Sequence, residues 1–321
     1  VEVMTRDRGR HLGMVRGAQL LTVNGVAVGT QLTQAQVEAL YPSAPGATVS
    51  FGLQQPGGGI IVASIINAVY QIDPVKAATV VPGTSVGYLN YTDFTTPSGE
   101  TRLADAFSYL GSAGITDLVV DLRYNGGGYL FMSAQLGYMA AGSRGDGKIF
   151  ENLVYNDKRS GENEAMPFIN TITNFLGSPR ANEVLTTLNL SRVFVLTSGD
   201  TCSASESFIN ALRGIDVEVI LVGGTTCGKP YGFSQENNCS LAYFPLEFEG
   251  LNNKNLSFPV TGITPTCPGD DDLSQPLGSP SERLLQTALF YQANNSCPAP
   301  ATAVERRSSA GKSQAAGLLG R

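Results

Sequence analysis

Two different patterns of apolar and polar residues divide the chain. Near the N-terminus, Val49, Phe51 and Leu53 alternate with small or polar residues, as in a strand with one buried face. From about residue 84 onward, continuous apolar runs instead alternate with segments whose apolar residues recur every three or four positions. This change predicts a small β-rich unit followed by a larger α/β layer with parallel strands.

The N-terminal part carries the signals of a small antiparallel unit. A strand is predicted over 18–23, and the Asn-Gly pair at 24–25 is typical of a two-residue hairpin turn. Thr33 and Gln36 have the spacing of a capping box, which predicts a short helix that ends before Pro42.

The rest of the chain alternates predicted strands with predicted helices. Polar residues dominate 156–190, which we expect to be an irregular insertion. The sequence SPSE at 279–282 predicts a last helix with Pro280 at its first position. The predicted strands cover 85–91, 117–122, 192–197 and 217–222, and the predicted helices cover 101–112, 129–140, 203–213 and 280–294.

Charge and composition exclude several classes of function. The net charge of −6 at pH 7 argues against a nucleic-acid-binding face, and no run of 18 apolar residues predicts a membrane-spanning helix. The single histidine, His11, excludes sites that need two imidazoles and makes a Ser-His-Asp triad depend on one residue. We expect no metal or other cofactor. Because the chain begins at Val1, we expect a mature or trimmed protein that has lost an export signal.

Cysteine usage favours an oxidising compartment. All five cysteines lie in the C-terminal 120 residues, and none has the C-x-x-C spacing of zinc ribbons or thioredoxin-like sites. Four could pair while one stays free, and a bridge between Cys227 and Cys239 would close a short loop. The alternative is five reduced, mostly buried thiols. The cysteines are Cys202, Cys227, Cys239, Cys267 and Cys297.

Two strand-to-helix turns are candidates for chemistry. In VVDLRYNGGGYL at 119–130, the glycines leave N–H groups free to bind an anion or a developing oxyanion; the alternative is a flexible turn. In VFVLTSGDTCSASESF at 193–208, Ser203 lies at the positive end of a helix dipole. Ser203 and Glu206 also match a capping box, so the alternative is that Ser203 only caps the helix.

A third candidate is the lysine in LVGGTTCGKPYGF at 221–233. The spacing nearly matches a P-loop, but Pro230 stands where a P-loop needs a serine or threonine for magnesium, which argues against an NTPase. Lys229 could instead act as a general base if burial among its apolar neighbours lowers its pKa. The alternative is a solvated surface charge.

The N-terminal unit resembles a PDZ domain. The resemblance rests on RGAQLLTVNGVAV at 16–28, the helix after it, and LYPSAPGATVSFGL at 40–53. It implies binding of peptide C-termini by strand addition, with a carboxylate-binding loop at or before 1–10. We assign no peptide-binding residue.

The three candidate segments together resemble the C-terminal processing (tail-specific) proteases, peptidase family S41. The residues that carry the resemblance are DLRYNGGG, the SASE at 203–206, and a lysine 26 positions after Ser203. The resemblance covers about 1–295 and implies a PDZ-like domain over 1–70. It also implies an α/β, ClpP/crotonase-like protease core over 71–297, followed by a tail or linker over 298–321.

The resemblance implies a serine endopeptidase with a Ser-Lys dyad that cleaves protein or peptide substrates near apolar C-termini. It implies export to the periplasm or cell envelope and is compatible with a homo-oligomer. Phe233 stands where some members have a glutamine. The alternative function is ligand binding without catalysis, as in the related retinoid-binding proteins. The implied roles are nucleophile for Ser203, general base for Lys229, oxyanion donor for Ala204 with Gly126 or Gly127, and accessory residue for Glu206 and Gln235.

Overall fold

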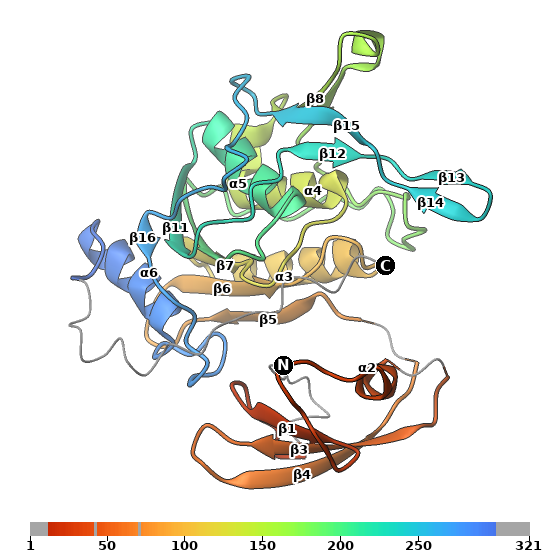
Figure 1. The fold of residues 1–321 in the computed structure, drawn as a ribbon. Helices are drawn as coiled ribbons and strands as arrows, with labels where there is room; N and C mark the ends of the chain where they lie inside the picture. Colours follow the sequence, from red (N-terminus) through yellow and green to blue (C-terminus); the bar gives the residue numbers. More distant parts are fainter. Residues whose placement is uncertain (1–11, 42–43, 70–71, 300–321) are drawn as a thin grey trace. The chain divides into compact units, whose positions relative to one another are not determined.

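A computed structural model describes residues 12–41, 44–69 and 72–299 of the chain (Figure 1). Contacts between Cα atoms divide it into two compact units. Of the described residues, the first unit holds those up to 69 together with Asp272–Pro276, and the second holds 72–271 and 277–299. His11 and the loop expected at 1–10 lie outside the described residues.

The first unit is an antiparallel sheet with one short helix. Asn24 and Gly25 both have positive φ, at 49° and 77°, which confirms the predicted hairpin turn. The capping box of Thr33 and Gln36 is also confirmed. The strand order is β2-β1-β3-β4. The elements are β1 (Gln19–Val23), β2 (Val26–Ala27), α2 (Gln34–Leu40), β3 (Thr48–Gln54) and β4 (Ile60–Ile66).

The second unit is built on a six-stranded sheet with the order β16-β11-β10-β7-β6-β5. Its neighbouring strands are parallel except for the antiparallel edge pair of β5 and β6, so the predicted α/β class is confirmed (Figure 1). The strands are β5 (Val75–Val80), β6 (Val86–Tyr91), β7 (Asp117–Asp121), β10 (Arg192–Thr197), β11 (Glu218–Gly223) and β16 (Cys267–Pro268).

Helices cover both faces of this sheet because successive strand residues point to opposite sides. Leu118 and Val120 join the main core with α3, α4 and α5, whereas Val119 joins the second core with α6. No helix among the described residues is long and apolar enough to span a bilayer. The helices are α3 (Gly99–Ser112), α4 (Leu130–Ala141), α5 (Ala204–Gly214) and α6 (Arg283–Asn294).

The prediction for the start of the last helix is wrong. The helix begins at Arg283, three residues after Pro280, with Glu282 as its N-cap. The Glu282 carboxylate accepts hydrogen bonds from the backbone N–H groups of Leu284 and Leu285, at 3.3 and 3.0 Å. A side chain that caps from position 282 fixes the first turn there, since it satisfies N–H groups that have no partner within the helix.

A second sheet, not predicted from the sequence, lies over the α5 side of the unit (Figure 1). Its order is β12-β15-β8-β9, and all its strand pairs are antiparallel. One strand of it lies in the segment 156–190, which is therefore only partly irregular. The strands are β8 (Ile149–Tyr155), β9 (Glu164–Pro167), β12 (Tyr231–Phe233) and β15 (Leu246–Leu251), with a separate hairpin of β13 (Glu236–Asn238) and β14 (Leu241–Tyr243).

The cysteines form two disulfides, Cys202–Cys227 and Cys267–Cys297. The bridge considered between Cys227 and Cys239 is therefore wrong. Cys239 is an exposed free thiol in the turn between β13 and β14, whereas Cys227 lies 5.2 Å from Cys202, measured between Cα atoms.

Candidate active site

The turn at 125–128 (the glycine turn) and the turn at 198–203 (the serine turn) meet at the carboxyl ends of the adjacent strands β7 and β10. A Cβ atom on Gly127 would lie 2.7 Å from the carbonyl oxygen of Cys202 and 2.8 Å from Cβ of Ser203. Gly127 also has φ of 100°, a region that favours glycine. The close approach of the two turns therefore requires glycine at this position.

Ser203 occupies a strained backbone position at the start of α5. Its φ is 56° and its ψ is −119°, unusual for a residue with a side chain. Ser203 is the N-cap of α5, and its N–H donates to Oε2 of Glu206 at 2.9 Å. Ser203 is half-buried. The strand-turn-helix setting thus presents a serine at the positive end of the helix.

Glu206 connects the serine turn to the segment at 224–230 that contains Lys229 (the lysine turn). Its carboxylate is fully buried and accepts from N–H of Ser203, Gly228 and Lys229 at 2.9, 2.8 and 2.9 Å. It also accepts from the hydroxyl of Thr226 at 2.5 Å. The Cys202–Cys227 disulfide joins the same two turns covalently. The positions of Ser203 and Lys229 are therefore fixed through one carboxylate and one disulfide.

Lys229 is half-buried, and burial lowers its pKa, while the negative charge of Glu206 acts in the opposite direction. Its Nζ lies 4.2 Å from the ring centroid of Phe233, a contact between a cation and the face of an aromatic ring. No hydrogen bond joins Lys229 to Ser203 within the described part of the chain. The strand β12 follows Lys229, whereas a P-loop would continue as a helix.

Ser203 and Lys229 line one cavity of about 260 Å³. Most of its other lining residues are aromatic or aliphatic, and one, Glu151, is acidic. The aromatic wall extends beyond the cavity, because the rings of Tyr129 and Phe131 both pack against Phe175. The remaining lining residues are Gly128, Tyr129, Leu130, Phe131, Met166, Ser207, Pro230, Tyr231, Gly232, Phe233 and Phe248.

The backbone N–H groups expected to bind the oxyanion differ in whether they already have a hydrogen-bond acceptor. The N–H of Gly127 already donates to Oδ1 of Asn125 at 2.9 Å. Ala204 is the first residue of α5, where backbone N–H groups have no partner within the helix. Gly126 is exposed, and Gly128 rather than Gly126 lines the cavity. The geometry thus favours Ala204 and a glycine of this turn other than Gly127.

Gln235 is not brought to the cavity. It is exposed in the loop after β12, and its side-chain amide donates to Asn237 at 2.8 Å. Cys202, Glu206 and Cys227 form the one group with metal-ligand atoms close together among the described residues. Because both cysteines are in the disulfide, neither offers a thiolate to a metal.

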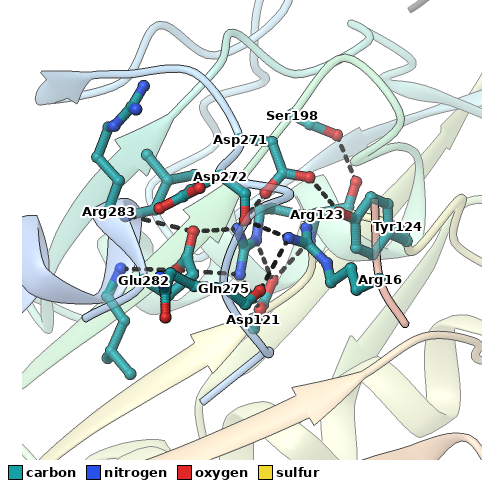
Figure 2. A network of polar contacts seen from close by, with 12 residues as sticks. Arg16, Asp121, Arg123, Tyr124, Ser198, Asp271, Asp272, Gln275, Glu282 and Arg283 are labelled. Carbon is teal, nitrogen blue, oxygen red and sulfur yellow. Dashed lines mark hydrogen bonds and ion pairs between the residues drawn. The ribbon is translucent and has the colours of Figure 1, made fainter. Parts of the chain in front are cut away.

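Sequence reasoning missed the role of Arg123, which anchors the glycine turn (Figure 2). Arg123 is fully buried and pairs with Asp121, Asp271 and Glu282 at 2.7, 2.5 and 2.8 Å. Burial opposes its charge, but the three carboxylates outweigh burial and raise its pKa. Ser198 donates to the carbonyl oxygen of Arg123. These contacts hold the end of β7 just before the glycines.

The model of Peptidase family S41 matches residues 85–243. A protein of Bacteroides fragilis NCTC 9343 classed as an S41 protease is 27% identical with a TM-score of 0.71, and the match covers 90% of this chain and 76% of that chain. The photosystem II D1 C-terminal processing protease is 20% identical with a TM-score of 0.46, covering 82% and 65%. No curated protein matches the chain.

Proposed function

Since the chain belongs to peptidase family S41, we propose that it is a serine endopeptidase in which Ser203 and Lys229 form the catalytic dyad. The observation that carries the proposal is the shared cavity of these two side chains at the carboxyl edge of the sheet. Glu206 supports it, because one carboxylate binds the backbone of both residues.

The proposed reaction begins with attack of Ser203 Oγ on the scissile carbonyl carbon. Lys229 in its neutral form takes the hydroxyl proton as the O–C bond forms, and the N–H of Ala204 with a glycine N–H stabilises the oxyanion. Lys229 then gives its proton to the leaving amine, and water hydrolyses the acyl-enzyme. Because Nζ rests on Phe233 in the free protein, the lysine turns toward Ser203 when substrate binds.

The decisive variant is Ser203→Ala. We expect cleavage of casein or of a peptide with an apolar C-terminus to fall at least about 10³-fold, since no nucleophile remains. Unfolding curves establish that the variant is folded. Equal cleavage by the variant would refute the proposal, and absence of cleavage by both proteins would favour the non-catalytic ligand-binding alternative.

We further propose that the first unit is a PDZ-like domain that recognises apolar C-termini of substrates, with the protease core beginning near residue 71. The antiparallel sheet with one short helix supports this role. Export to the periplasm or cell envelope is supported by the two disulfides, which persist in oxidising compartments.

A further inference from the structure

The inner part of the cavity contains a carboxyl group that the proposed dyad does not use. Glu151 on β8 is only 5% exposed, and its Oε2 is buried without a hydrogen-bond partner. A buried polar atom that lacks a partner has lost its hydration without compensation, which is unfavourable. Such a group is expected where a ligand supplies the missing partner.

Most of the residues that line the cavity with this carboxyl group are apolar, and Lys229 is the one basic residue among them. Tyr129, Tyr231 and Phe233 are about 40% exposed, whereas Glu151 and Ser207 are each 5% exposed. The cavity therefore runs from a partly exposed aromatic rim to a buried polar end. A side chain that fills it needs an apolar stem and a polar tip.

The second sheet makes room for Glu151. A Cβ atom on Gly250 of β15 would lie 1.4 Å from Oε1 of Glu151, so the carboxyl group occupies space that this glycine leaves open. Burial raises the pKa of Glu151 to about 7, and the side chain of Ser207 partly opposes that rise. The cavity thus holds a carboxyl group that a bound cation would ionise.

We propose that Glu151 is the specificity-determining residue of this cavity and selects a substrate side chain with an apolar stem and a cationic tip, such as lysine. The inference rests on the proposed function, because it places this side chain next to the bond that Ser203 attacks. A cationic side chain binds here more strongly than a neutral hydrogen-bond donor does. Its charged tip pairs with the carboxylate of Glu151, and it passes the faces of the aromatic rings.

The test compares two peptides that differ only at the residue before the scissile bond, with lysine in one and norleucine in the other. Norleucine keeps the apolar stem and lacks the ammonium group. The wild-type protein is measured for kcat/KM at pH 8, and Ser203→Ala is measured for Kd by calorimetry. Each is repeated with Glu151→Gln, with Glu151→Leu, and with Glu164→Gln as the matched control on the exposed strand β9.

We expect the wild-type protein to prefer lysine at least tenfold, and Glu151→Gln or Glu151→Leu to abolish or reverse that preference while Glu164→Gln retains it. A preference for norleucine in the wild-type protein, or a lysine preference unchanged in both folded Glu151 variants, overturns the inference. If Ser203→Ala binds lysine peptide more tightly but the wild-type protein cleaves neither peptide, the proposed function fails and the role of Glu151 stands.

Discussion

The ion-pair network of Arg123 and the titratable groups of the cavity differ in how they are paired. Arg123 is surrounded by three carboxylates and donates to Asp121 through two nitrogens, at 3.0 and 2.7 Å. In the cavity, by contrast, Glu151 keeps an unpartnered oxygen and Lys229 contacts an aromatic ring rather than a carboxylate.

This difference separates charges that stabilise the fold from charges available for chemistry. A buried ion that is fully paired has little free energy left to give a ligand, and loss of its partner is costly. A buried group without a partner destabilises the free protein, and it becomes more stable when the substrate supplies that partner. Glu206 lies in the site but is paired like Arg123, so we expect it to position the dyad rather than to react.

Among the paired groups that position the site, the largest effect on catalysis is expected for Glu206→Gln. The amide replaces one acceptor oxygen with a donor, so at least one of the four N–H and O–H donors loses its partner. We expect kcat/KM on a cleavable peptide to fall about 100-fold as the turns that carry Ser203 and Lys229 shift. The exposed control Glu218→Gln should change kcat/KM less than twofold. Full activity of Glu206→Gln would contradict the claim that the Glu206 carboxylate positions Ser203 and Lys229.

The second prediction concerns the paired region. Arg123→Met leaves three carboxylates without their cation, and we expect the free energy of unfolding to fall by about 3–5 kcal/mol. Arg159 is 40% exposed and also pairs with two glutamates, so Arg159→Met should lower the free energy of unfolding far less than Arg123→Met does. Urea denaturation measures both, and equal losses would contradict the contrast between buried and exposed pairs.

The two disulfides can be removed separately and compared, because they close loops of similar length. They join residues 25 and 30 positions apart, so replacing either pair by serines should cost a similar stability, about 3.5 kcal/mol by loop entropy. Only loss of Cys202–Cys227 should also lower kcat, because only that bridge joins the two turns of the dyad. Thermal melts and kcat for the two double variants test this, and an equal loss of kcat in both would disprove it.

The smallest expected change is a gain of stability in Glu151→Gln. The folded pKa of Glu151, about 7, lies above its ordinary value of 4.5, so the folded state holds a proton that the unfolded state releases. The contribution of Glu151 to stability therefore decreases as pH rises from 4.5 to 7 and then levels off, by about 3 kcal/mol in all. Relative to the wild type, Glu151→Gln should gain stability over this interval in urea titrations. A difference that does not vary with pH would mean that Glu151 is not buried and unpaired.

Local signals in the sequence predicted local structure well. The Asn-Gly turn at 24–25 and the capping box at Thr33 depend on residues a few positions apart, and both are present. The start of α6 was missed because Glu282 both caps that helix and pairs with Arg123, which is 159 positions away. The periodicity of apolar residues in the helix cannot predict such a tertiary contact.

The candidate site was predictable where motifs carry it and not elsewhere. Ser203 and Lys229 belong to the turns that the sequence marked, and the structure places both at one cavity. Glu151 resembles any polar residue of a strand, and only its packing against α5 and β15 buries it. Gly250, inside the strand LEFEGL, was the available signal, since glycine within a strand often marks a close approach.

The central claim is the dyad, and the pH profile of kcat/KM for the wild-type protein and Lys229→Arg tests it most directly. Burial lowers the pKa of Lys229 from 10.5, so wild-type activity should rise with pH to a midpoint below that value as the neutral amine forms. Arginine stays protonated, so Lys229→Arg should lose at least about 10³-fold at every pH. A Lys229→Arg protein that cleaves at the wild-type rate with the same midpoint would contradict the account.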